Sequence, residues 1–405
     1  MATRRLYYDD SYMRSFSAHV LGCVPAEPVS TPSGPQAAWE VVLDQTALYP
    51  TSGGQPNDLG CLGEAKVLDV RDADDVILHI VDREMERGEV QGSIDWARRF
   101  DHMQQHTGQH LLSAMFQERY GLPTVSFHLG SDLCTVDLRG PEPILDVREG
   151  AQRAANQVVF EDRPVTVRYG TPNQLAQVGV RKEVDRQGIL RAIEIDAADL
   201  QPCGGTHVRS TGQIGLVLVR RCSKVRQDWR VEFACGARAE RLAGRDFQML
   251  REVSDGLSCS PDDAPAAIGK LMAERDAHFK SLRSTLEQLA RVLSKTMVSE
   301  ASLARNGLWI VAQLLREVHP ELLLPLATEL AKHEKAVALL VHEETGQIVF
   351  AEHASAGIDL AAILKRVLAV TPGKGGGSRD FVRARLADPA RSAEALELAK
   401  KLLAG

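Results

Sequence analysis

The 405-residue sequence has no excess of basic residues: 48 Lys and Arg stand against 54 Asp and Glu, and the formal net charge is -6. The chain therefore lacks the strongly basic character typical of many nucleic-acid-binding proteins, and any contact with RNA must depend on local basic patches. The sequence also has no apolar run approaching the roughly 20 residues that a helix needs to cross a bilayer. We expect a soluble, cytoplasmic protein without a membrane-spanning segment.

The seven cysteines are an odd number and lie far apart, unlike the cysteines of a disulfide framework. This pattern favours a reducing compartment. The Gly-rich stretch at residues 46–56 is not followed by Gly-Lys-Ser or Gly-Lys-Thr at P-loop spacing, which excludes that class of phosphate site. No Ser-His-Asp or Cys-His pattern of a nucleophilic hydrolase stands out either.

The distribution of apolar residues predicts an α+β multidomain chain. Residues 1–95 contain short apolar segments with turn signals, which predict a β-rich, barrel-like domain. Helix and strand patterns mix over 96–250, which we expect to form an α+β domain. Residues 260–300 predict a long helical or coiled-coil connector, and 301–405 predict a C-terminal α/β domain. The connector has an apolar stripe at spacings of three and four, typical of a packing seam. A homodimer contact through the connector or the C-terminal domain is one interpretation.

Two short runs far apart in the chain carry the residues of a metal site, HTGQH at 106–110 and CGGTH at 203–207. The first lies in an apolar-periodic segment, so a helix would place both of its histidines on one face. In the second, two glycines permit a tight turn that brings the cysteine and the histidine together. Three imidazoles and a thiolate suit zinc better than calcium or magnesium, which prefer oxygen ligands. The two runs together predict a zinc site.

The spacing leaves two questions about this site open. His102 lies one turn before His106, so spacing alone does not say which two of the three helix histidines bind the metal. Four protein ligands usually make a closed structural site, whereas catalysis needs an open position. We favour an ion that acts as a Lewis acid or water activator. A zinc that only pins two segments together is the alternative. The candidate catalytic side chains beside the metal are Thr206, His102 and Gln109.

A second Gly-rich stretch, GKGGGSR at 373–379, lies in a local basic cluster that also contains Arg383 and Arg385. Backbone amides of a Gly-rich loop and several basic side chains can grip phosphates without reading a base sequence. The alternative is a solvated basic face. We predict RNA-binding residues in this loop and beside it: Lys374, Gly375, Gly376, Gly377, Arg379 and Arg383.

Four stretches carry a resemblance to a known family: TALYPTSGGQP at 46–56, DHMQQHTGQHLLS at 101–113, PCGGTHVRSTGQIG at 202–215, and GKGGGSR at 373–379. Taken together, they make the chain resemble the freestanding alanyl-tRNA editing proteins of the long type. It is similar in the same way to the editing and C-terminal domains of alanyl-tRNA synthetases. The last stretch resembles a Gly-rich loop that those C-terminal domains share with DHH-type phosphoesterases.

The resemblance implies a trans-editing hydrolase that deacylates mischarged tRNA(Ala) by zinc-dependent ester hydrolysis. The mischarged residue is expected to be chiefly serine, with glycine as a further candidate. No aminoacylation module is expected. The family's zinc ligands carry over onto His106, His110, Cys203 and His207. The substrate-binding residues that the resemblance implies are Thr46, Gly53, Gly54, Gln55 and His128.

Two other functions compete with this interpretation. One is a tRNA-binding protein with a structural zinc and no hydrolytic activity. The other is a phosphoesterase acting through the C-terminal domain, and the sequence argues against it because the chain has no Asp-His-His run for the metal cluster of that class.

Overall fold

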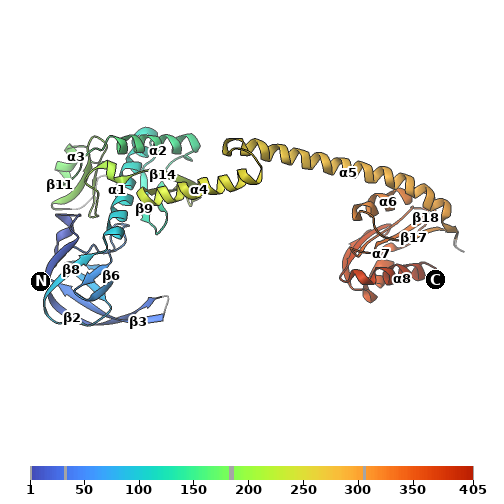
Figure 1. Ribbon diagram of the computed structural model, residues 1–405, viewed down its shortest axis with the longest axis horizontal. Helices are drawn as coiled ribbons and strands as arrows, with labels where there is room; N and C mark the ends of the chain where they lie inside the picture. The colour runs from blue at the N-terminus through green and yellow to red at the C-terminus, as the bar shows by residue number, and fades with distance from the viewer. Residues whose placement is uncertain (1, 32–33, 182–186, 304–306, 405) are drawn as a thin grey trace. The chain divides into compact units, whose positions relative to one another are not determined.

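The computed structural model describes residues 2–31, 34–181, 187–303 and 307–404 (Figure 1). The chain divides into two compact units, Met1–Glu252 and Val253–Gly405, each with apolar clusters of its own. Both units combine helices with sheets, so the predicted mixture of α and β structure is confirmed. The finer division at residues 95, 250 and 300 stays a prediction. Of the helices in the described ranges, none combines the length and apolar character that a bilayer crossing requires.

The first ninety or so residues of the first unit form a closed barrel in the order β2-β3-β7-β6-β5-β8. Alternate residues of each strand point inward, as Val41 and Leu43 do, and both are fully buried. Two short strands, β1 and β4, pair in parallel beside it, and the first Gly-rich stretch follows β4. The bounds are β1 Arg4–Arg5, η1 Leu6–Tyr8, β2 Ser15–Thr31, β3 Gly34–Leu43, β4 Gln45–Thr46, β5 Gly60–Leu62, β6 Ala65–Ala73, β7 Val76–Val81 and β8 Gly88–Ile94.

Helix α1 (Trp96–Tyr120) runs through the centre of the rest of this unit. The Asp95 side chain caps its N-terminus by accepting the Arg98 N–H, and Gly121 ends it in the left-handed conformation (φ 65°). Nearly every residue from His102 to Phe116 is buried, so neighbours enclose the helix on all sides. A Cβ at Gly108 would lie 2.2 Å from Cys235 Sγ, which explains a glycine in the middle of the helix.

Two antiparallel sheets surround α1. One has the order β14-β15-β10-β9 and the other the order β11-β12-β13. Apolar residues of α1, α2 and the four-stranded sheet form one core. The bounds are β9 Thr124–Leu129, β10 Cys134–Leu138, α2 Leu145–Phe160, β11 Val165–Gly170, α3 Pro172–Gln177, β12 Leu190–Ile195, β13 Asp199–Pro202, η2 Thr211–Ile214, β14 Val217–Val225, β15 Asp228–Cys235 and α4 Gly236–Gly256.

The second unit is a six-stranded sheet in the order β16-β17-β18-β19-β21-β20, in which only the β17–β18 pair is parallel among the described residues. One apolar cluster joins the sheet to α7 and α8, and the other joins it to α6 and α5. The bounds are η3 Pro261–Asp263, α5 Ala264–Glu300, β16 Ser302–Leu303, β17 Trp309–Leu315, η4 Pro320–Leu322, α6 Leu323–Leu330, β18 Ala336–His342, β19 Gln347–Glu352, α7 Leu360–Val370, β20 Gly373–Gly377, β21 Phe381–Leu386, η5 Pro389–Arg391 and α8 Ser392–Ala404.

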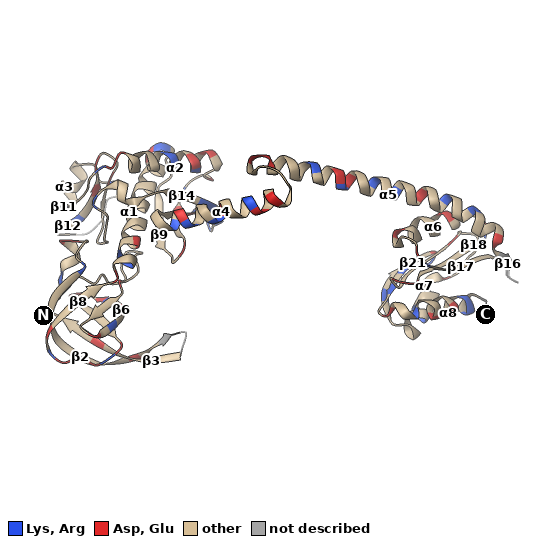
Figure 2. Ribbon diagram, in the orientation of Figure 1, with Lys and Arg blue, Asp and Glu red and all other residues tan. Residues whose placement is uncertain are grey.

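The helix predicted within residues 260–300 is confirmed as α5, while its role as a connector stays a prediction. The apolar stripe of α5 has two different environments. Leu286 and Ala290 are buried in the cluster with α6, whereas Met272 and Phe279 are more than half exposed. Basic and acidic residues alternate along the helix (Figure 2), as expected of a solvated surface. The homodimer contact stays a prediction.

The prediction that the second Gly-rich stretch forms a loop is wrong. Residues 373–377 form the edge strand β20, which pairs with β21. A Cβ at Gly375 would lie 2.3 Å from both the Arg383 carbonyl oxygen and Ala384 Cβ. Glycine is therefore present because the two strands approach closely, a reason that composition alone does not reveal.

Candidate metal centre

The two histidine-containing runs converge on one point of the first unit. His106 and His110 project from the same side of α1, and Cys203 and His207 come from the turn that follows β13. The Cys203 Sγ atom lies 3.5 Å from His106 Nε2 and 3.3 Å from His207 Nε2. The ligand atoms of all four residues lie within 4.8 Å of one another. Three of the side chains are buried and Cys203 is half-buried.

This donor set fits a four-coordinate metal ion. Bonds of about 2.0–2.3 Å in a tetrahedron separate the ligand atoms by roughly 3.3–3.7 Å, and the two sulfur–nitrogen distances fall in that range. Among the described residues, one group of His, Cys, Asp or Glu side chains has the geometry to hold a metal ion, and it is this cluster. The arrangement has the chemistry of an N/S site and not of an oxygen site.

Each of the three imidazoles has a partner at its other ring nitrogen. His106 Nδ1 donates to Gln55 Oε1 at 2.8 Å, and His207 Nδ1 lies 3.1 Å from Thr107 Oγ1. His110 Nδ1 donates to Asp199 Oδ2 at 3.0 Å. With a proton on Nδ1, each Nε2 keeps its lone pair for a metal. Such outer partners orient ligating histidines and set their tautomer.

The carboxylate behind His110 is itself held by a cation. Asp199 Oδ1 accepts a hydrogen bond from Arg181 Nε at 2.6 Å, and both side chains are largely buried. The Asp199 pKa is lowered: burial opposes this, but His110 and Arg181 outweigh it. Asp199 and Arg181 are not part of the sequence prediction. The available signal was strand alternation, because residues 199, 201 and 203 share one face of a strand.

The pKa values within the cluster favour a thiolate. Burial raises the pKa of Cys203, but the electrostatic interaction with the His106 and His207 imidazoles holds it well below its usual value. Burial lowers the pKa of His207 to about 3. Burial also opposes a charge on His110, yet hydrogen bonds to Asp199 and Cys203 raise its pKa to about 9. The two histidines differ because one faces a carboxylate and the other a hydroxyl.

A fixed turn presents Cys203. Arg191 Nη1 donates to the carbonyl oxygens of Cys203 (2.7 Å) and Gly205 (3.0 Å). The Gly205 N–H lies 3.3 Å from Cys203 Sγ. A Cβ at Gly205 would lie 2.2 Å from the His106 ring, so only glycine fits between the turn and α1. Arg191 is absent from the sequence prediction.

One side of the cluster faces a cavity of about 350 Å³. His106, His110 and Cys203 line it, together with residues of the Gly-rich stretch and of β9. Phe127 of β9 stacks on the His106 ring with centroids 5.5 Å apart. The four-ligand cluster is therefore open to a small ligand on one side.

The predicted substrate residues differ in their relation to this cavity. Gly53 lines it, and a Cβ at Gly54 would lie 3.0 Å from Phe127. Gln55 is fully buried and bridges the two motifs, because it accepts from His106 and its Nε2 donates to Thr206 Oγ1 at 2.8 Å. Gln55 thus holds a ligand instead of lining the cavity.

Thr46 and His128 lie away from the cavity walls that the described residues form. The Thr46 hydroxyl is buried and lies 2.9 Å from His79 Nε2, inside the barrel end. His128 is exposed, whereas its neighbours Phe127 and Leu129 pack towards the core. The cavity is lined instead by residues 124–127 of the same strand, which the predicted substrate residues do not include.

The three candidate catalytic side chains are all buried. Gln109 lines the cavity, and its Nε2 donates to Ser113 Oγ at 2.8 Å. Thr206 is held by Gln55. His102 lies outside the cavity lining in the described part of the chain, and burial together with nearby arginines lowers its pKa to about 3. Gln109 is the candidate with direct access to a ligand.

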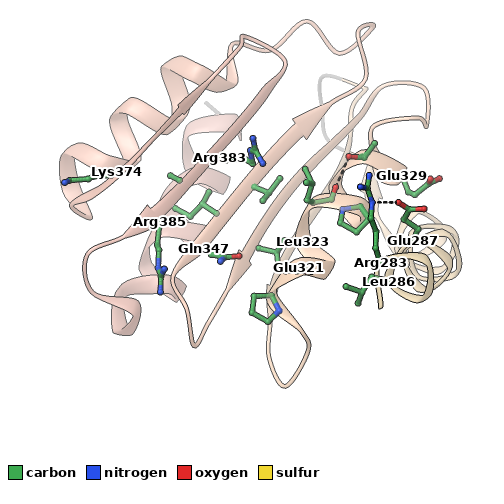
Figure 3. Close-up of a pocket in the computed structure, with 17 residues that line it drawn as sticks. Arg283, Leu286, Glu287, Glu321, Leu323, Glu329, Gln347, Lys374, Arg383 and Arg385 are labelled. Carbon is green, nitrogen blue, oxygen red and sulfur yellow. Dashed lines mark hydrogen bonds and ion pairs between the residues drawn. The ribbon is translucent and has the colours of Figure 1, made fainter. Parts of the chain in front are cut away.

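The residues predicted to bind RNA lie at the free edge of the second unit's sheet. Lys374 of β20 and Arg383 of β21 line a groove of about 950 Å³ (Figure 3). Arg385 lies opposite Lys374 and lines the same groove. Arg379 instead donates to a backbone carbonyl before α7 at 3.1 Å. A smaller cavity beside α7 is lined by Gly375, Gly376 and Gly377.

Three protein-family models match parts of the chain. Residues 2–98 match the model of tRNA synthetases class II (A), and residues 190–230 match the threonyl and alanyl tRNA synthetase second additional domain. Residues 306–405 match the DHHA1 domain. The second match contains the CGGTH turn, and the third contains the glycine-rich edge strand.

Curated relatives extend the similarity to nearly the whole chain. The alanine–tRNA ligase of Pyrococcus abyssi is 31% identical over 420 residues, which cover 99% of this chain but 44% of the ligase. The chain thus spans less than half of that relative. The alanyl-tRNA editing protein Aarsd1 of Rattus norvegicus is 29% identical, over 95% of this chain and 94% of that protein. The alanyl-tRNA editing protein AlaX-L of Pyrococcus horikoshii is 30% identical, over 94% of each. On this full-length similarity, the chain belongs to the family of freestanding alanyl-tRNA editing proteins.

Proposed function

We propose that the chain is a trans-editing hydrolase that releases the wrong amino acid from mischarged tRNA(Ala). Serine is the proposed main substrate and glycine a second one. The observation that carries the proposal is the convergence of His106, His110, Cys203 and His207 beside a cavity of about 350 Å³. Membership of an editing family, whose named members are similar along nearly the full chain, supports the same reaction.

We propose zinc as the metal. Three imidazoles and a low-pKa thiolate are typical zinc ligands, and hydrogen bonds at all three Nδ1 atoms leave the Nε2 atoms for the ion. When bound, zinc supplies Lewis-acid polarisation and lowers the pKa of water. The chain contributes the pocket around it: Phe127 covers one face of His106, and the Gln109 side chain borders the space where the ester would lie.

Serine recognition is proposed to depend on the loop that follows β4. Tyr49 of this loop lines the cavity, and the loop begins where the Leu48 N–H donates to Thr46 Oγ1 at 3.1 Å. Thr46 therefore acts through the loop in this proposal. We expect Thr46→Val to lower serine discrimination while the metal content stays unchanged.

The second unit is proposed to hold the tRNA. Lys374, Arg383 and Arg385 come from the two neighbouring strands β20 and β21 and line the groove (Figure 3). Their side chains are exposed, and three cations at strand spacing suit phosphates of an RNA backbone. This contact carries no base readout, so it supplies affinity and leaves the choice of amino acid to the first unit.

The test is a deacylation assay with seryl-tRNA(Ala), with and without a chelator, on wild type and Cys203→Ala. We expect zinc-dependent release of serine by wild type, and loss of both zinc and release in the variant. Cys222→Ala is the matched control, because Cys222 is a partly buried cysteine of the same unit outside the cluster. Retention of full activity by a zinc-free Cys203→Ala protein would contradict a catalytic zinc.

A tRNA-binding protein with a structural zinc is the second candidate. A complete set of four protein ligands favours it, because closed sites of this kind are usually structural. The same assay separates the two functions. A binding protein would retain tRNA and zinc, yet release no serine at any metal concentration.

A further inference from the structure

We propose that a rim beside the metal centre, made of Tyr8, Arg191 and Tyr169, binds the unpaired 3′ nucleotides of the charged tRNA by stacking. The inference rests on the proposed function, because it concerns the path of the same substrate. It adds an RNA contact in the first unit, separate from the basic groove of the second.

The register of the three-stranded sheet places this rim next to Cys203. Tyr169 of β11 lies directly opposite Arg191 of β12. The Cys203 N–H donates to the Arg191 carbonyl oxygen at 3.0 Å, which continues the β12–β13 ladder by one residue. Residues directly opposite one another on antiparallel strands point to the same face. Tyr169, Arg191 and Cys203 therefore form one row, and Tyr169 lies two strand spacings, about 10 Å, from the metal ligand.

Tyr169 is more exposed than the inner residues of its sheet. Its side chain is 58% accessible, and Val167, on the same face of the same edge strand, is 41% accessible. The inner residues of the sheet on that face, such as Ile193, are buried. Among the described residues, the apolar face thus continues outward from the site and ends in an exposed aromatic ring.

Arg191 joins the aromatic rings of the rim to the turn of the metal site. Its guanidinium lies 5.4 Å from the centroid of the half-buried Tyr8 ring. Its Nη1 is held by two carbonyl oxygens of the Cys203 turn, so the guanidinium plane has a defined orientation. A Cβ at Gly204 would lie 3.5 Å from the Tyr8 hydroxyl, and Gly204 also lines the cavity. The rim and the cavity therefore share one border.

An aromatic–arginine–aromatic row suits single-stranded nucleotides. Every base has a flat face that stacks on tyrosine or on a guanidinium, and the cation attracts phosphate. In an aminoacyl-tRNA the ester is on the terminal ribose, at the end of an unpaired strand. If that ester lies in the cavity, the preceding nucleotides must leave across its border. Arg191 and Tyr8 lie beside the Cys203 turn at that border, and Tyr169 is the next residue outward in the sheet.

The test is binding of the full chain to an uncharged RNA hairpin, labelled with a fluorophore, with and without an unpaired 3′ overhang of four nucleotides. Wild type should prefer the overhang. We expect Tyr169→Ala to weaken overhang binding roughly 5- to 100-fold and to leave blunt hairpin binding unchanged. Tyr169→Phe keeps the ring and should bind like wild type. Phe247→Ala is the matched control, because Phe247 is also 58% accessible but lies on α4.

Two results would overturn the inference: an equal effect of Tyr169→Ala and Phe247→Ala on overhang binding, or no overhang preference in wild type. Zinc content and the thermal unfolding curve of Tyr169→Ala check that the fold is intact. The binding uses uncharged RNA, so it is independent of hydrolysis. Wild type that prefers the overhang but releases no serine would contradict the proposed function and leave the rim in place.

Discussion

Replacing Asp199 with asparagine tests how the chain prepares its metal ligands. Asp199 accepts from His110 Nδ1 at 3.0 Å and from Arg181 Nε at 2.6 Å, so both neighbours are donors. An asparagine has one acceptor and one donor end. Whichever way the amide turns, its NH2 group faces one of the two donors. If it faces His110, the imidazole must move its proton to Nε2, the nitrogen that would bind the metal.

The expected loss of zinc affinity follows from the hydrogen bond that Asp199 accepts from the ligating His110. Removing the outer partner of a ligating histidine typically weakens metal binding by about 10- to 100-fold, which corresponds to roughly 1.4–2.7 kcal/mol. We expect Asp199→Asn to lower zinc affinity within that range, measured by competition with a chromogenic chelator. Asp196→Asn changes an exposed aspartate of the same hairpin and should leave zinc affinity unchanged. A zinc affinity of folded Asp199→Asn within threefold of wild type would refute the reasoning.

Three further predictions concern stability. Asp58→Asn leaves the fully buried Arg99 guanidinium without its charge partner and should lower the free energy of unfolding by about 3–5 kcal/mol. The melting temperature should fall by roughly 6–20 °C. A loss of free energy below about 1 kcal/mol would contradict this prediction. Burial lowers the pKa of His79 from 6.5 to about 4, so the unfolded state binds the proton more readily between these pH values. The contribution of neutral His79 to the free energy of unfolding is therefore fully present above pH 6.5 and is lost as the pH falls towards 4. At pH 5 this loss is roughly 2 kcal/mol. In urea unfolding, the free energy of unfolding should differ less between pH 7 and pH 5 for His79→Gln than for wild type. Equal differences for the two proteins would show that His79 is not the source of the pH dependence. Gly375→Ala should destabilise the second unit by about 1–3 kcal/mol in chemical denaturation. Gly376→Ala is the control and should change the stability little, because a Cβ at Gly376 has nothing within 4 Å. Similar losses for both variants would argue that close strand approach is not the reason for the glycine at 375.

The metal cluster was predictable because its halves are local. Two histidines four apart in an apolar-periodic segment share a helix face whatever the rest of the chain does. A Cys-Gly-Gly-Thr-His run favours a turn for an equally local reason. Joining the two halves required chemistry, since three imidazoles and a thiolate together suit one zinc ion. The structure places all four side chains together, while their function as zinc ligands stays a proposal.

The partners of these residues were not predictable from local pattern. Gln55 was expected in the substrate pocket, but it holds His106 because the barrel loop packs against α1 from fifty residues away. His128 was expected beside the pocket, but the cavity is lined by residues 124–127 of the same strand. A motif does not specify which part of a strand borders a cavity, because that depends on how the strand packs against the rest of the unit.

The sequence alone determined the features that depend on residue type and short spacing: the helix with its histidine pair, the Cys-Gly-Gly turn, the long connector helix and the family resemblance. Only the tertiary structure decided which side chains stand behind the ligands, that the second glycine run is an edge strand, and that Tyr169 shares a row with Cys203. The physical reason is distance along the chain. Contacts between Asp199 and His110, or Gly375 and Ala384, depend on how separately formed elements pack, and that packing is set by the whole core.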